Sequence, residues 1–219
     1  MERMSDYLVF IGRGGYSVIE VAIDRIGYVP VVIPFKDRYD MWEFSWGYDY
    51  AWNIKAGDRV AFVVGGLVGY VGRVAYVERD VSREEFIEFL RENGLSDYIG
   101  FWKPHLDRSN RHVVASVNDI SRFKPILLDE EPRHRYPDMS DIRELLKEYA
   151  VANGLVSSRE AGIDRVEDIL KSLIPRYKKM FAPYGSRLRN PYMRLLPNTA
   201  ILDRLIEIAG IEPIQHVRD

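Results

Sequence analysis

Aromatic residues occupy every second position between Trp42 and Trp52. The six rings belong to Trp42, Phe44, Trp46, Tyr48, Tyr50 and Trp52. Because successive side chains of a strand point to opposite faces, an extended segment would carry all six rings on one face. That face would either fill the core of a sheet or stack against a planar ligand such as a nucleobase. A turn predicted at 47–49 would break the run, so two interpretations stay open: a purely structural core, or part core and part ligand pocket.

Composition narrows the class of protein. The 219 residues, 47% of them hydrophobic, are enough for one sizeable domain. No apolar run approaches the roughly 18 residues of a membrane span, and the N-terminus lacks the pattern of a signal peptide, so we expect a cytoplasmic protein. The absence of cysteine excludes disulfides, thiolate zinc sites and cysteine nucleophiles. A single glutamine beside many charged residues is typical of a thermophile.

Apolar patterns predict a strand-rich body over residues 5–128. The predicted strands are 7–11, 29–35, 59–64, 67–77 and 111–117, and the predicted helices are 17–26 and the segment after a capping box of Ser82 and Glu85. Prolines in 29–35 favour an edge strand, and Gly69 and Gly72 indicate bulges in the second hairpin strand. Beyond residue 128 the pattern becomes helical, at 142–152, 164–173 and 201–209. We therefore predict an α+β fold.

The strongest charge asymmetry lies between Lys171 and Leu202. This segment has no Asp or Glu, and it contains Lys171, Arg176, Lys178, Lys179, Arg187, Arg189 and Arg194, interspersed with Tyr177, Phe181, Tyr184 and Tyr192. Cations neutralise phosphates and rings stack on bases, so this composition is typical of a nucleic-acid-binding surface. The alternative is a solvated basic face balanced by the acidic stretch 129–148. The predicted phosphate contacts in the segment are Lys178, Lys179, Arg187 and Arg189.

A second basic segment covers residues 102–112. Its cations Lys103, Arg108 and Arg111 are predicted to contact phosphates, with a solvent-facing loop as the alternative. His105 and His112 make a poor metal site, because the chain has no thiolate and no further histidine nearby. We therefore expect no metal.

The sequence lacks the patterns of common enzyme classes. It has no phosphate-binding NTPase loop, no dinucleotide fingerprint, no serine nucleophile elbow and no zinc-protease helix. None of its lysines has an acidic residue two positions before it, a spacing that many metal-dependent nucleases need. We therefore predict a binding domain with no catalytic residues and no cofactor.

Several segments, taken in order, resemble the PUA-like superfamily and in particular its EVE and YTH branch of modified-nucleobase readers. Residues 7–11 look like the first strand of that branch, 50–64 with 69–75 like its tryptophan loop and central hairpin, 113–126 like a later strand and its exit, and 190–199 like the end of such domains. The match covers both ends of the chain and leaves 130–185 as a helical insertion within a single domain of residues 1–219. The chain is also similar to the N-terminal domain of archaeal McrB-type restriction GTPases.

The resemblance implies a small twisted β-barrel, flanked by helices, that holds a flipped or unpaired modified base in an aromatic cage. The implied cage residues are Trp52, which matches the tryptophan before the central hairpin, and Trp46, Tyr48 and Trp102 as further walls. The implied contacts to the base edge are Arg13, Tyr16 and Ser17. The implied partner is DNA, expected to be methylated, in a modification-dependent restriction system whose AAA+ GTPase and nuclease subunit lie outside this chain.

Two other functions stay open at this point. The chain is an RNA reader of the same fold if its base-binding site contacts a 2′-hydroxyl, which the sequence does not show. It is a protein-interaction module if the aromatic run is entirely core and the basic segment docks an acidic protein.

Overall fold

The fold is organised around one long, curved pair of antiparallel strands. The computed structural model describes residues 4–12, 14–35, 51–128, 133–152, 154, 192–196 and 199–214. Strands β4 (Leu67–Ser82) and β5 (Arg111–Phe123) pair over more than ten residues. Beyond β5 lies the edge strand β2 (Val29–Pro34), and beyond β4 lie β3 (Arg59–Val64), β1 (Asp6–Ile11) and β8 (Met193–Leu195) in that order. Strands β1 and β3 are parallel, whereas the other neighbouring strands are antiparallel.

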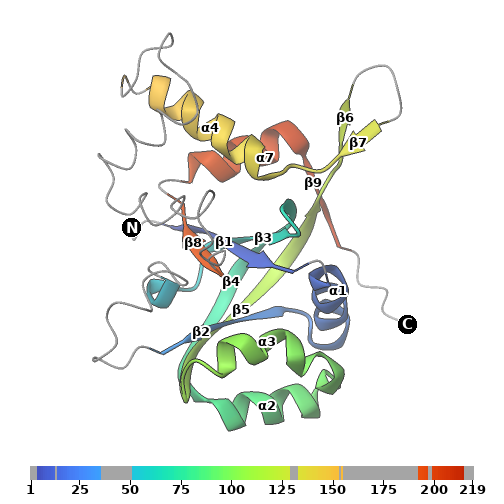
Figure 1. Ribbon diagram of the computed structural model, residues 1–219, viewed down its shortest axis with the longest axis vertical. Coiled ribbons are helices and arrows are strands. Elements are labelled where there is room, and N and C mark those ends of the chain that lie inside the picture. The colour runs from blue at the N-terminus through green and yellow to red at the C-terminus, as the bar shows by residue number, and fades with distance from the viewer. Residues whose placement is uncertain are drawn as a thin grey trace.

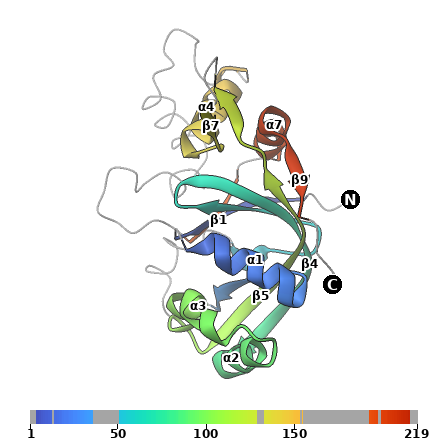
Figure 2. The same cartoon turned by 90° about the vertical axis from the view of Figure 1, so that its right-hand side faces the viewer.

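Irregular pairing curls this sheet into a half-barrel (Figures 1 and 2). Gly69 has no partner on β3, because the pairing steps from Tyr70 directly to Val68. A second register shift surrounds Gly72, where an added Cβ would lie 2.7 Å from Cγ1 of Val117. Both predicted bulges are confirmed, and each lets β4 bend where a flat strand would continue.

Two short pairings extend the sheet. Strand β9 (Ile211–Pro213) pairs with the end of β5. Strands β6 (Ile126–Leu128) and β7 (Arg133–Arg135) form a separate two-stranded sheet that projects from the body (Figure 1).

Helices cover the sheet in two groups, with one helix between them (Figures 1 and 2). They are α1 (Gly15–Ile26), α2 (Arg83–Glu92), α3 (Ile99–Leu106), α4 (Met139–Ala152) and α7 (Ala200–Ala209), with the 3₁₀ turns η2 (Ala51–Asn53) and η3 (Ser96–Tyr98). Helices α2 and α3 lie at one end of the molecule, α4 and α7 at the other, and α1 lies between the groups. Among these helices none is long and apolar enough to cross a membrane.

Apolar side chains form three clusters. The first joins β1 to β5 with α1 and includes Phe62. The second lies between the sheet and helices α4 and α7 and includes Leu202. The third lies between the sheet and helices α2 and α3, with Phe86 and Trp102 at its centre. Both faces of the curled sheet are therefore packed over part of their area.

The predicted fold class is confirmed as α+β, a half-barrel sheet with flanking helices. The capping box is confirmed as well. The Ser82 hydroxyl accepts from the Glu85 N–H at 3.1 Å, and the Glu85 carboxylate accepts from the Ser82 N–H at 2.7 Å. Predicted strands 7–11, 29–35 and 59–64 are found within one residue at each end, because their apolar runs are bounded by turn residues.

Other predictions are wrong or lie outside the described residues. The segment 102–112, predicted as a loop, begins inside helix α3, which buries Trp102 and Leu106 at a spacing of one helical turn. Strand β5 continues past the predicted end at 117, because it keeps pairing with β4 and then with β9. The predicted helix 164–173 and most of the insertion 130–185 fall outside the described residues, and the single domain of residues 1–219 stays a prediction.

Candidate nucleic-acid interface

The described structure covers half of the predicted site residues. Arg13, Trp46, Tyr48, Lys178, Lys179, Arg187 and Arg189 lie outside the described residues. Tyr16, Ser17, Trp52, Trp102, Lys103, Arg108 and Arg111 lie within them, and they occupy separate parts of the fold.

Trp52 lies in η2, at the start of a tightly held turn that leads into β3. The buried carboxylate of Asp58 organises this turn. Its Oδ1 accepts from the Ser5 N–H at 2.8 Å, and its Oδ2 accepts from the Lys55 N–H at 3.0 Å. Gly57 has a φ of 92°, where a side chain would be strained, and its N–H donates to a carbonyl of β4 at 2.8 Å. The turn is thus tied to the N-terminal segment and to β4.

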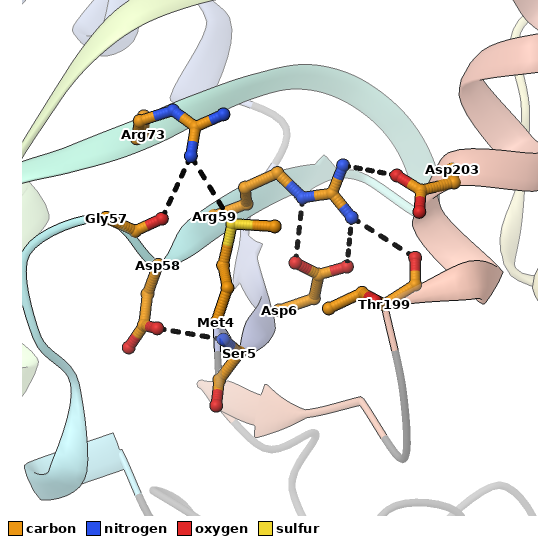
Figure 3. Close-up of polar contacts among 9 residues, drawn as sticks. All are labelled: Met4, Ser5, Asp6, Gly57, Asp58, Arg59, Arg73, Thr199 and Asp203. Atoms are coloured by element: carbon orange, nitrogen blue, oxygen red, sulfur yellow. Dashed lines mark hydrogen bonds and ion pairs between the residues drawn. The ribbon is translucent and has the colours of Figure 1, made fainter. Parts of the chain in front are cut away.

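Two arginines of β4 hold the same turn by its carbonyl oxygens. Arg79 donates from Nη1 to the Trp52 carbonyl at 2.7 Å and from Nη2 to the Ile54 carbonyl at 2.9 Å. Arg73 donates from Nη1 to the Gly57 carbonyl at 3.1 Å (Figure 3). Since a carbonyl carries no net charge, these hydrogen bonds leave both positive charges in place. Both arginines are exposed.

We call residues 51–58 the Trp52 turn. Its tryptophan is half-buried, whereas Ile54 two positions later is fully buried. The cations Lys55, Arg73 and Arg79 lie in or against the turn. A partly accessible indole beside positive charges has the chemistry to stack a base and to neutralise a phosphate.

An ion-pair network fixes the strand ends beside the Trp52 turn (Figure 3). Arg59, the first residue of β3, donates two hydrogen bonds to the carboxylate of Asp6 in β1, from Nε at 2.8 Å and from Nη2 at 2.6 Å. Its Nη1 pairs with Asp203, and its Nη2 also donates to the Thr199 carbonyl at 3.1 Å. Burial alone lowers the pKa of Arg59, but its bonds to Asp6 and Asp203 outweigh this and raise the pKa. The network therefore joins β1, β3 and α7 through a charged arginine.

The prediction that Trp102 forms a cage wall is wrong. Its side chain is 0% exposed, and its Nε1 donates to the Pro30 carbonyl at 3.0 Å. Its ring packs edge-on against Phe86, with 6.1 Å between the centroids. No base can reach this ring, because helices α2 and α3 enclose it against the sheet. Trp102 is a core residue.

Tyr16 and Ser17 lie at the other end of the β1–β3 pair from the Trp52 turn. The Trp52 turn precedes Arg59, which pairs with Asp6, whereas α1 begins after Ile11 at the opposite end of β1. Those two ends are roughly 17 Å apart at the usual rise of a strand. One base cannot bridge this separation, so the prediction of a single pocket that unites Trp52 with Tyr16 and Ser17 is wrong.

Tyr16 instead belongs to a polar cluster at the start of α1. Its ring packs against Tyr70 with 5.6 Å between centroids, and the Tyr70 hydroxyl donates to Glu20 at 3.0 Å. Arg122 pairs with the same Glu20 carboxylate and lies 5.7 Å from the centre of the Tyr70 ring. Burial raises the pKa of the Tyr16 hydroxyl, which therefore remains a hydrogen-bond donor at neutral pH. Ser17 is exposed beside it.

The second basic segment lies on and after α3. Lys103, Arg108 and Arg111 are exposed, as a phosphate contact requires. Arg111 is paired with Asp80, with 3.1 Å between Nε and Oδ1, so part of its charge is already compensated. His112 falls in the predicted strand 111–117 and is a fully buried residue of β5. The described residues contain no group of three potential metal ligands.

No local pattern in the sequence identifies Arg73 and Arg79 as part of the Trp52 turn. Charged residues on an outer strand face usually point to solvent. Only the folded structure reveals their role, because β4 extends beyond the start of β3 and thereby places Arg79 beside η2.

Comparison with known proteins gives only distant similarities. No family model matches this chain, and no curated protein matches it. The solved structure of ASCH from Zymomonas mobilis is similar over 64% of this chain and 93% of its own, with 9% identity and a TM-score of 0.36. A point mutant of that protein is similar over 64% of this chain and 80% of its own, with 8% identity and a TM-score of 0.36.

Proposed function

We propose that this chain is a nucleic-acid-binding module of the PUA-like kind that holds one unpaired base against Trp52. The observation that carries the proposal is the Trp52 turn, in which a half-buried indole lies on a backbone fixed by Asp58 and Arg79. Stacking a base on an aromatic ring contributes about 1–3 kcal/mol. Because the backbone that carries Trp52 is already fixed, binding orders little further main chain, so more of this energy is expected to appear as affinity.

Positive charge supplies the part of the affinity that does not depend on base identity. Lys55 lies in the Trp52 turn and Arg73 and Arg79 bind its carbonyl oxygens, and these three cations are proposed to neutralise the phosphates on either side of the held base. The basic segment 171–202 and the exposed cations Lys103 and Arg108 are proposed to add further phosphate contacts.

The proposed ligand is DNA with one modified, methylated base. Extruding a base costs a few kcal/mol, least where pairing is already weak, and a methyl group adds apolar area buried against the indole. Trp46 and Tyr48 are the proposed further walls, and Arg13 a proposed contact to the base edge. Because Tyr16 and Ser17 lie too far from Trp52, they are proposed to contact a neighbouring nucleotide.

The proposed role is that of a targeting module in a modification-dependent restriction system of the McrB type. In such a system the chain itself performs no catalytic step, and an AAA+ GTPase with a nuclease subunit acts on the bound DNA. The proposal rests on the sequence resemblance to PUA-like readers of the EVE and YTH branch and on the Trp52 turn.

The test compares two tryptophans that differ in burial. Trp52→Ala is expected to weaken binding to a single-stranded oligonucleotide by on the order of tenfold and to abolish the preference for a methylated base, with little change in melting temperature. The matched control Trp102→Phe removes a buried indole and is expected to lower the melting temperature while the base preference is kept. Fluorescence anisotropy with labelled DNA containing 5-methylcytosine, N6-methyladenine or neither measures both effects.

Three outcomes decide between the candidate functions. Unchanged affinity and discrimination in Trp52→Ala would show that the ring does not stack a base. Tighter binding to RNA of the same sequence than to DNA would favour an RNA reader. Binding to none of these oligonucleotides would leave the protein-interaction module as the remaining function.

A further inference from the structure

A cleft of about 260 Å³ opens between helix α2 and the sheet, away from the Trp52 turn. It crosses three neighbouring strands, β2, β5 and β4. This volume is below the roughly 300–1,000 Å³ of pockets for drug-sized ligands, so the cleft suits a ligand of about the size of one side chain.

Strand register builds the floor of the cleft. Tyr76 of β4 pairs with Ser116 of β5, which pairs in turn with Pro30 of β2. Glu78, two residues after Tyr76, points to the same face of the strand and pairs with Val114. Two adjacent rows of side chains from three strands therefore form one surface, and all five residues line the cleft.

Aromatic rings form the walls. Tyr28 and Phe89 lie nearly parallel, with 6.4 Å between centroids and 22° between planes. Phe86 also stacks on Phe89, with 5.9 Å between centroids. Tyr76 is 61% exposed, a high value for so large a ring, and completes the aromatic lining.

The charge of the cleft has one sign. Among the described residues that line it, Glu78 and Glu85 are acidic and none is basic. Hydrogen bonds from Ser82 lower the pKa of the Glu85 carboxyl. The bond from the Ser82 backbone has the larger effect and the bond from its side chain the smaller one, so this group stays ionised in mildly acidic solution. Burial raises the pKa of the Tyr28 hydroxyl and the nearby charge of Glu78 adds to this, so Tyr28 stays neutral beside a carboxylate.

We propose that this cleft binds an organic cation, an alkylammonium group that lies against the aromatic lining with its charge facing Glu78 and Glu85. Ring faces attract cations through their quadrupoles, and the carboxylates supply complementary charge. A nucleic acid would bring phosphates next to two carboxylates, which disfavours it as the occupant. A bare metal ion would need more oxygen ligands than the two glutamates provide among otherwise apolar walls.

Two kinds of ligand contain such an alkylammonium group: a lysine side chain of a protein, methylated or not, and a free polyamine. The proposal does not depend on nucleic-acid binding at the Trp52 turn, because the cleft shares no lining residue with that turn. Failure of either proposal therefore leaves the other standing.

The experiment titrates the full chain with tetramethylammonium, spermidine and acetylated amides of lysine and trimethyllysine, followed by NMR shifts of Tyr28 and Tyr76 and by calorimetry. We expect saturable binding of at least one cation. The amide in which an uncharged tert-butyl group replaces the trimethylammonium group of trimethyllysine should bind on the order of tenfold more weakly than trimethyllysine itself. Comparing spermidine with the two lysine amides identifies the source.

Isosteric variants place the binding in the cleft. Glu78→Gln combined with Glu85→Gln removes both charges while Gln keeps the capping hydrogen bond, and it should weaken cation binding on the order of tenfold. The matched control Glu84→Gln removes one charge from the same helix outside the cleft and should leave binding unchanged. The proposal is wrong if no cation binds, if the neutral analogue binds as tightly, or if Glu84→Gln weakens binding as much as the double variant.

Discussion

Trp52 and Trp102 show how burial separates two identical side chains. Trp102 is enclosed by helices and its indole N–H is satisfied by a backbone carbonyl, so it stabilises the fold. Trp52 is held through its backbone instead, because Arg79 donates to its carbonyl, and the residue is only half-buried. A tryptophan on a fixed backbone that is not fully buried suits base stacking better than one enclosed in the core, which is why Trp52 and not Trp102 enters the proposed function.

His105 gives a prediction at the residue scale. Its ring lies against Tyr192, with 3.5 Å between centroids, and burial lowers its pKa from 6.5 to about 4, helped by the charges of Arg108 and His112. Between these two pH values the unfolded chain binds a proton that the folded chain does not, so stability falls as the pH falls from 6.5 towards 4. We expect this residue to contribute on the order of 2 kcal/mol to that loss, allowing for its partial exposure.

The measurement is urea unfolding of the parent and of His105→Gln at pH 7, 6, 5 and 4. The variant should show a smaller decrease of the free energy of unfolding between pH 6.5 and 4. Parallel curves for the two proteins would mean that His105 titrates normally in the folded state.

At the scale of elements, β4 determines the shape of the molecule. This strand pairs with β3 over its first half, continues past the start of β3, and there supplies Arg79 to the Trp52 turn and Tyr76 and Glu78 to the cleft. Its bend depends on Gly72, where a side chain would collide with the neighbouring strand β5. The two candidate sites therefore depend on the same curved strand.

Gly72→Ala tests this dependence. The new Cβ would lie 2.7 Å from the Val117 side chain and 2.8 Å from the backbone oxygen of Asn118, and backbone cannot move aside without disturbing the β4–β5 pairing. We expect a loss of about 1–3 kcal/mol in the free energy of unfolding, as overpacking typically causes. Gly69→Ala is the matched control, because its Cβ would meet only the Tyr16 ring at 3.0 Å, and it should cost less. Equal losses in urea unfolding would contradict the steric account of the bend.

At the scale of the whole molecule, pairing between distant segments limits what the sequence can predict. The α+β class, the hairpin, α1 and the capping box follow from local apolar spacing and turn residues, and these were predictable. The ion pairs of Arg59 with Asp6 and Asp203 join segments up to 144 residues apart, so no local pattern in the sequence predicts them. Helix α3 was hidden by Pro104 and its polar neighbours, although Ile99, Trp102 and Leu106 carry a helical spacing.

The candidate site shows the same division. The sequence places Trp52 just before the hairpin, and its role in base binding stays a prediction, whereas the contacts of Arg73 and Arg79 with the turn depend on where β4 passes it. Trp52 and Trp102 each follow an apolar or aromatic residue and precede a polar one, so only packing distinguishes the core tryptophan from the half-buried one. Residue type predicts the chemistry, but long-range pairing decides which groups meet.

The last prediction concerns the charge distribution of the whole chain. The acid-free segment 171–202 is proposed to bind phosphates, so replacing Lys178, Lys179, Arg187 and Arg189 with Ala should weaken binding to all DNA sequences alike. The slope of log affinity against log salt concentration should become shallower by about one for each lost phosphate contact. As a control, Arg91→Ala with Arg204→Ala removes two cations that are paired with Glu88 and Glu207, and the slope should stay as it is. Gel-shift titrations at several salt concentrations measure the slopes. If the quadruple variant keeps the parent slope and affinity, the segment does not bind phosphates, and an acidic protein becomes the better partner for it.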